Sequence, residues 1–144
     1  MLDNPDLRAP IAMSLGAIAG ALTRYYLGQW VTQSIDSSIP LGTLVINLSG
    51  CWLMGFITTL ATRRILTSPD ILLLITTGFL GSYTTFSSYE LEAAELFEAN
   101  VESDYLSGLN GDLLYWIGSP LLGLSSCLVG VGCARIISLS RPLD

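Results

Sequence analysis

The residues best suited to chemistry lie in the third apolar stretch of the chain, where Thr76–Glu90 reads TTGFLGSYTTFSSYE. No charge occurs from Ile71 to Tyr89, so this stretch can enter a bilayer, yet its middle holds two glycines and a run of hydroxyls. A helix that faces lipid needs neither feature. Unwound backbone is tolerated at mid-membrane only where it lines a cavity or holds an ion. We therefore predict a transmembrane helix that breaks near its centre.

Gly81 and Thr84 flank the predicted break, in the sequence Gly81-Ser82-Tyr83-Thr84-Thr85. Unwinding there would free backbone carbonyls, which need a partner inside a membrane, and a monovalent cation is one such partner. The alternative is a simple glycine kink whose free groups are satisfied by neighbouring hydroxyls.

Phe86 and Tyr89 lie three residues apart just after the break and share one helical face. Packing in the core is one interpretation. The other uses the ring electrostatics, because aromatic edges carry partial positive charge and could solvate a small anion in a narrow path. The Ser87 hydroxyl adds a donor to the same region.

Polar residues in the other apolar stretches could face the same path. Asn47, one helical turn after Thr43, is either an interhelical hydrogen-bonding residue or a donor that lines the path, because an amide at bilayer depth needs a partner. Tyr115 and Ser119 are four apart and share a face, which is weak evidence alone. Arg24 could extend its charge to the membrane surface or attract anions at a pore mouth.

These residues must be positioned by membrane helices. The 144-residue chain is 51% hydrophobic and 12% charged, against about 25% charged residues in a typical soluble domain. Its uncharged intervals are long enough to cross a bilayer, which takes about 20 apolar residues. We predict an all-α integral membrane protein, with residues 1–144 forming a single four-span domain without a soluble domain or a cleaved signal. The predicted spans are 10–30, 41–62, 69–99 and 113–138, with a loop at Asn100–Asp112.

Composition argues against several classes of function. The chain has no histidine, and its six cationic residues are all arginines. Nucleic-acid binding lacks a basic patch, and an enzyme lacks a metal-ligand cluster or a nucleophile with its base. We therefore expect neither activity. The three cysteines fall inside predicted spans and are interpreted as small packing residues.

Four helices of this length cannot easily enclose a polar path alone, so we expect the chain to form an oligomer, for which a two-fold dimer is the commonest solution. If both termini are cytoplasmic, five of the six arginines face inward, namely Arg8, Arg63, Arg64, Arg135 and Arg141. This bias predicts one fixed orientation of the chain.

Three motifs, in order along the whole chain, resemble the Fluc/CrcB family of fluoride ion channels. They are Gly20-Ala21-Leu22-Thr23-Arg24-Tyr25, the segment Gly42–Gly50, and Thr76–Ser87, of which the last is highly specific. The resemblance implies an antiparallel dimer of four-span subunits with two fluoride pores. It also implies a structural sodium ion at the dimer centre, bound by the backbone carbonyls of Gly81 and Thr84 from both subunits.

By motif position, the resemblance places Asn47, Phe86 and Ser87 along the fluoride pore. Less specifically, it adds Tyr115 and Ser119 as a polar track. The chain departs from the family pattern at Tyr89, where the second pore aromatic is usually phenylalanine, and the phenol adds a donor and bulk. A second departure is Gly81-Ser82 in place of two glycines. Glu92 follows the aromatic pair, and we assign it no role.

We expect passive export of fluoride from the cytoplasm across a bacterial inner membrane, without ATP. The second subunit is the same chain or, given the arginine bias, an oppositely oriented paralogue. One alternative is a small four-span drug or cation exporter, which needs a carboxylate buried in the membrane; the first, second and fourth spans contain none. The other alternative is a non-transporting subunit of a membrane complex.

Overall fold

The computed structural model describes residues 5–103 and 105–139, and every regular element in these ranges is helical. The elements are α1 (Pro5–Ser34), α2 (Leu41–Thr62), α3 (Pro69–Leu73), the π-helix η1 (Leu74–Leu80), α4 (Gly81–Tyr83), α5 (Phe86–Ser103) and α6 (Tyr105–Leu139). The predicted all-α class is therefore confirmed.

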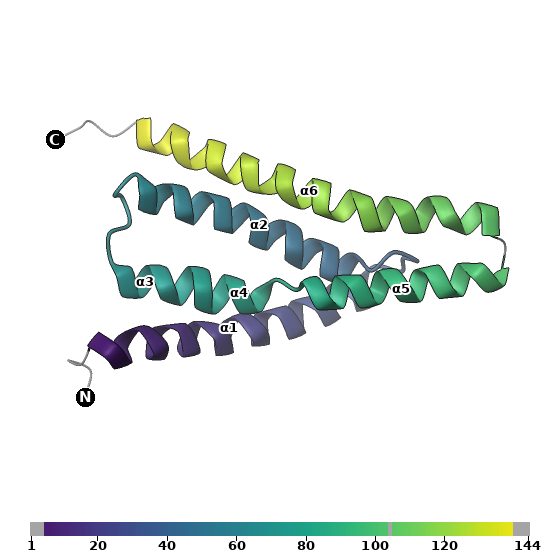
Figure 1. Cartoon of the computed structure of the whole chain (residues 1–144), viewed down its shortest axis with the longest axis horizontal. Helices are drawn as coiled ribbons and strands as arrows, with labels where there is room; N and C mark the ends of the chain where they lie inside the picture. Colours follow the sequence, from purple (N-terminus) through teal and green to yellow (C-terminus); the bar gives the residue numbers. More distant parts are fainter. Residues whose placement is uncertain (1–4, 104, 140–144) are drawn as a thin grey trace.

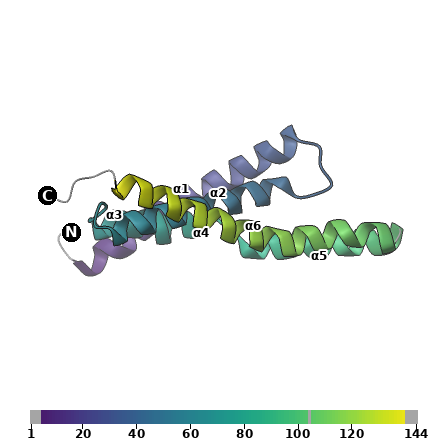
Figure 2. The ribbon, with the colours of Figure 1, turned by 90° about the horizontal axis from the view of Figure 1, so that it is seen from above.

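The helices form an elongated bundle in which α3, η1, α4 and α5 follow one another as a single interrupted helix (Figure 1). In that bundle α1 packs along η1, and α2 packs along α6. Both ends of the described chain lie at the same end of the bundle, together with the loop between α2 and α3 (Figure 1). Figure 2 shows that the α1–α2 end diverges from the paired α5 and α6 at the opposite end.

Three stretches in the described part of the chain are long and apolar enough to cross a membrane, namely Leu41–Thr62, Pro69–Ala99 and Asp112–Leu139. They match the second, third and fourth predicted spans closely, so the chain is a multi-pass membrane protein. The first predicted span lies within α1, a 30-residue helix that contains Pro10. The four-span topology remains a prediction.

The predicted loop at residues 100–112 is wrong for most of its length. In the structure α5 continues to Ser103, and α6 begins at Tyr105. The glycines and asparagine of this segment suggested a loop, but α5 and α6 pack against each other as antiparallel neighbours. Tertiary pairing of this kind overrides weak local helix propensity.

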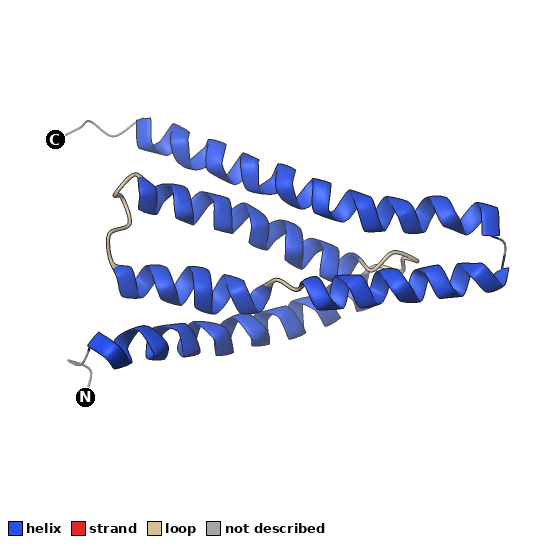
Figure 3. Cartoon of the chain, in the orientation of Figure 1, coloured by secondary structure: helices blue, strands red, loops and turns tan. Residues whose placement is uncertain are grey.

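The predicted break in the third span lies at Thr84 and Thr85, where Figure 3 shows a short loop between two helices. Thr84 adopts an extended backbone, with φ −78° and ψ 156°, which ends the helix. The π-helical segment η1, just before the break, was not expected from the sequence. It lies against α1, where an added Cβ on Gly16 would meet the Leu74 carbonyl oxygen at 2.1 Å.

Close backbone contact occurs at two glycines, in the way that small residues let membrane helices approach each other. A Cβ on Gly20 would lie 2.2 Å from the Phe79 carbonyl oxygen, and one on Gly130 would lie 2.1 Å from the Trp52 carbonyl oxygen. Only glycine permits these approaches. The first brings α1 against η1, and the second brings α6 against α2, so both position the helices that surround the break.

Candidate functional site

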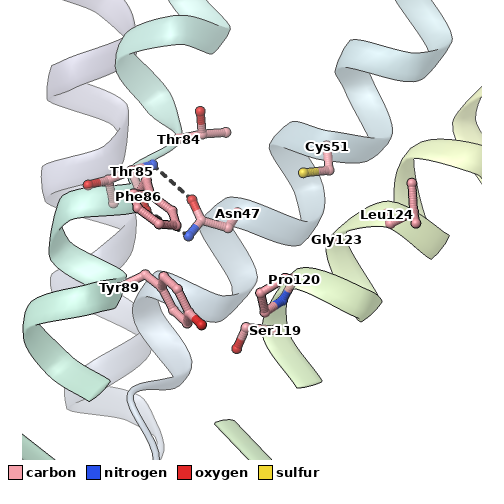
Figure 4. A pocket seen from close by; sticks show the side chains of 10 residues that line it. All are labelled: Asn47, Cys51, Thr84, Thr85, Phe86, Tyr89, Ser119, Pro120, Gly123 and Leu124. Carbon is pink, nitrogen blue, oxygen red and sulfur yellow. Dashed lines mark hydrogen bonds between the residues drawn. The ribbon is translucent and has the colours of Figure 1, made fainter. Parts of the chain in front are cut away.

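Asn47 on α2 holds the interrupted helix at its break through two hydrogen bonds to one residue. Its Nδ2 donates to the Thr85 carbonyl oxygen at 2.9 Å, and its Oδ1 accepts from the Thr85 N–H at 2.8 Å. Figure 4 shows the amide turned toward this segment. The interhelical hydrogen bond considered from the sequence is therefore present, and one N–H of Nδ2 is left over for another acceptor.

The break also depends on Thr85, which caps the N-terminus of α5. Its Oγ1 accepts from the Ser88 N–H at 3.1 Å, the usual geometry of a threonine N-cap. In a continuous helix, the Thr85 N–H would donate to the Gly81 carbonyl and the Ser88 N–H to the Thr84 carbonyl. Both donors are bound elsewhere, so the Gly81 and Thr84 carbonyls lose their helical partners.

A pocket of about 260 Å³ lies between the break and α6 (Figure 4). It is lined by residues of α2, the break, α5 and α6: Asn47, Cys51, Thr84, Thr85, Phe86, Tyr89, Ser119, Pro120, Gly123 and Leu124. Four of the predicted pore residues, Asn47, Phe86, Tyr89 and Ser119, are thus brought together by three different helices.

The two aromatic rings of this pocket lie in different environments. Phe86 is 72% exposed in the single chain, whereas Tyr89 is only 4% exposed. Their ring centroids are 5.7 Å apart, and the ring planes are tilted by 46°. Phe86 therefore forms an exposed part of the pocket wall in the single chain, and Tyr89 forms a buried part.

Ser119 supplies the most unusual polar atom of the pocket. Its Oγ is buried, and within the described part of the chain it has no hydrogen-bond partner. Ser125 on the same helix, by contrast, donates to the Leu121 carbonyl one turn earlier. A buried hydroxyl without a partner is costly, which suggests that a ligand uses it.

Tyr115 does not line this pocket. It is 3% exposed and donates to Glu92 Oε2 at 2.9 Å, while Thr43 Oγ1 donates to Glu92 Oε1 at 2.6 Å. Tyr115 also packs against Tyr89, with ring centroids 5.5 Å apart. Glu92 therefore connects α2, α5 and α6. Sequence reasoning assigned it no role; its spacing of three residues from Tyr89 was the available signal.

Arg24 lies in a second pocket, of about 420 Å³, between α1, α2 and α5. Thr43, Ser88 and Glu92 line the same pocket, and Thr85 lines both pockets. The arginine is thus separated from Asn47 and Phe86 by the break segment, and does not line the pocket that contains them.

Ser87 belongs to neither pocket. It is exposed on the first turn of α5, and its Oγ is 3.4 Å from Thr85 Oγ1. The structure of the single chain therefore does not bring it together with the other predicted pore residues.

Known proteins similar to this chain agree on one family. The model of the family described as "CrcB-like protein, Camphor Resistance (CrcB)" matches residues 11–131. Relatives from Synechococcus sp. (strain JA-2-3B'a(2-13)) and Trichormus variabilis are each 47% identical, over 92% and 94% of this chain and 97% and 95% of their own lengths. A relative from Synechocystis sp. is 43% identical over 93% of this chain and 98% of its own. All three are named "Fluoride-specific ion channel FluC".

Proposed function

The chain belongs to the CrcB family, and from that premise we propose that it is a fluoride-specific ion channel through which fluoride leaves the cytoplasm passively. Its relatives are named as ion channels, so its function is transport and it is not an enzyme. The observation that carries the proposal is the pocket at the helix break, where neutral donors converge inside a membrane protein.

Fluoride is strongly hydrated, and a pore must replace its water with other donors. The unpartnered Ser119 hydroxyl is one, and the remaining N–H of Asn47 is a second. The ring edges of Phe86 and Tyr89 provide weaker positive potential. None of these groups carries a full charge, so an anion could be bound and then released. Ser87 would join this path only in an assembly with a second subunit, whereas Tyr115 is buried within one chain and bonds to Glu92.

We also propose the structural sodium ion that the family resemblance implies. The carbonyls of Gly81 and Thr84 lost their helical N–H partners to Asn47 and Thr85. Carbonyl oxygens are suitable ligands for a monovalent cation. One chain offers two such oxygens, and a second copy related by a two-fold axis would offer two more. The ion would neutralise these oxygens and fix the break.

A second subunit in antiparallel orientation would cover the exposed side of the pocket. Phe86, at 72% exposure, would be covered there by the partner. The subunit interface is therefore expected to complete the pore, with lipid around the remaining apolar surface. Arg24, in its separate pocket, would attract anions toward one mouth of the path.

The partner is the same chain or an oppositely oriented paralogue. The start of α1, the loop after α2 and the end of α6 lie toward one end of the bundle (Figure 1), and these segments carry Arg8, Arg63, Arg64 and Arg135. Arg141 lies outside the described residues. Such asymmetry favours one orientation in a bacterial inner membrane. The two cases are distinguished by expressing this chain alone in cells and labelling single cysteines placed at its termini from outside the membrane. A homodimer requires both orientations of the chain.

The decisive experiment is fluoride efflux from liposomes that contain only this protein, followed with a fluoride electrode while valinomycin carries potassium as the counter-ion. We expect efflux without ATP and without a proton gradient, and none for chloride. Replacing sodium by a large organic cation throughout purification should lower the flux. Efflux no faster than from empty liposomes refutes the channel, and a requirement for a proton gradient indicates an exporter.

A further inference from the structure

Tyr89 differs from the phenylalanine expected at its position by one hydroxyl, and the structure shows where that hydroxyl is used. Tyr89 is 4% exposed, and its phenol donates to the backbone carbonyl of Trp116 on α6. The hydrogen bond therefore joins α5 to α6 at the wall of the pocket. An unbound phenol would instead have been a further donor for the anion.

The Trp116 carbonyl is available because of Pro120. In an α-helix the carbonyl of residue 116 accepts from the N–H of residue 120, but proline has no N–H, and its ring pushes the carbonyl of the preceding turn aside. Pro120 lies inside the continuous helix α6. Without another donor, this carbonyl would be unsatisfied within the membrane, which is costly. The Tyr89 hydroxyl takes the place of the missing N–H.

The same hydrogen bond fixes the geometry of the pocket. Tyr89 stands between two other rings, with centroids 5.7 Å from Phe86 and 5.5 Å from Tyr115, and is bound at its far end to α6. Ser119, whose hydroxyl is unpartnered, immediately precedes Pro120. Figure 4 shows the Tyr89 ring extending toward the turn of α6 that carries both.

We infer that Tyr89 and Pro120 act as a pair, in which the phenol replaces the N–H that proline lacks and thereby positions the Tyr89 ring and Ser119 on opposite sides of the ion path. Tyr89 is a positioning residue through its hydroxyl and presents only its ring to the anion. The positioning role rests on the proposed channel function, whereas the pairing itself does not.

The inference predicts that the effect of removing the hydroxyl depends on residue 120. Tyr89→Phe alone leaves the Trp116 carbonyl without a donor, and we expect single-channel fluoride conductance to fall about fivefold, as for one lost buried hydrogen bond. Pro120→Ala restores a backbone N–H. In that background the same Tyr89→Phe change should lower conductance by less than about twofold, because the helix satisfies its own carbonyl.

Single-channel conductance in planar bilayers is the readout, since it is measured per functional channel and is unaffected by the fraction of protein that folds. Tyr83→Phe is the matched control. Tyr83 is equally buried, and its hydroxyl bonds to Ser49 Oγ at 2.8 Å rather than to a carbonyl freed by proline. Its substitution should change conductance by the same factor in the parent chain and in the Pro120→Ala background.

Two results would overturn the inference: an equal loss from Tyr89→Phe in both backgrounds, which would make the hydroxyl a direct ligand of the ion, or no loss with Pro120 present. The unfolding midpoint in detergent should also be measured for the parent chain, Tyr89→Phe, Pro120→Ala and the double variant. These midpoints test the pairing of Tyr89 and Pro120 separately from the channel proposal. If the parent protein passes no fluoride current, the channel proposal fails and the positioning role fails with it. Non-additive midpoints would still support the pairing, and additive midpoints would overturn it.

Discussion

Replacing Asn47 by aspartate tests whether this residue both supports the helix break and lies beside a permeating anion. The change keeps the size of the side chain and its acceptor for the Thr85 N–H at 2.8 Å. It removes the Nδ2 donor that binds the Thr85 carbonyl at 2.9 Å, and it places a negative charge in the pocket. The predicted result is a severe loss of fluoride flux.

The magnitude has two parts. Losing one hydrogen bond and leaving a carbonyl unsatisfied costs about 1–3 kcal/mol. Two like charges about 4 Å apart repel by about 4 kcal/mol at an effective dielectric constant of about 20. If only the repulsion raises the barrier to permeation, the flux falls roughly a thousandfold, since about 1.4 kcal/mol corresponds to a factor of ten.

Asn47→Ala separates the two parts, because it removes both hydrogen bonds to Thr85 without adding charge. We expect about a tenfold loss of efflux from liposomes for alanine, and a further loss of roughly a thousandfold for aspartate, which adds the charge repulsion. Flux should be normalised to the fraction of liposomes that contain an active channel. Equal losses of flux for alanine and aspartate would refute the placement of Asn47 beside the ion. Asn47 would then act only by stabilising the helix break.

Two further substitutions test other residues of the site, and a third tests the packing of α6 against α2. Phe86→Ile removes the ring edge and keeps an apolar side chain, so fluoride efflux should fall about tenfold; unchanged efflux would remove Phe86 from the path. Ser119→Ala removes a hydroxyl that has no partner in the described chain, so efflux should fall about fivefold at an unchanged unfolding midpoint. Ser125→Ala is the control and should leave efflux unchanged, because the Ser125 hydroxyl already bonds to a carbonyl of its own helix. Gly130→Ala should lower the free energy of unfolding by about 1–3 kcal/mol, because its Cβ would meet a backbone oxygen at 2.1 Å, whereas Gly132→Ala, with open space around it, should not.

Much of the helical architecture follows from the sequence. The second, third and fourth spans predicted from the sequence match the long apolar helices closely, and the glycine- and hydroxyl-rich segment predicts the break that the structure places at Thr84 and Thr85. These features depend on local composition and on the backbone of one segment, so they can be inferred without the fold. The prediction of a loop at residues 100–112 was wrong, because the helical structure of this segment depends on the pairing of α5 with α6, which is a non-local effect.

The composition of the site was less accessible. Residue types and family motifs indicated Asn47, Phe86, Tyr89 and Ser119, and the structure brings these four into one pocket. The same reasoning placed Ser87 and Tyr115 beside them, yet in the single chain Ser87 is exposed, and Tyr115 bonds to Glu92. Helical spacing gives the direction of a side chain relative to the axis of its own helix. It does not determine how that helix is rotated relative to its neighbours, and this rotation decides which side chains meet.

The sequence by itself determined that this chain enters a membrane, that its third long helix is interrupted, and which neutral donors are available there. Only the tertiary structure decided which side chains bond to the backbone groups that lack helical partners. Asn47, 38 residues away, bonds to the N–H and the carbonyl of Thr85 at the interruption. On α6, Tyr89 donates to the Trp116 carbonyl that Pro120 leaves without a donor. The physical reason is that hydrogen-bond partners between helices are set by depth and rotation in the bundle, and the close contacts at Gly16, Gly20 and Gly130 fix both.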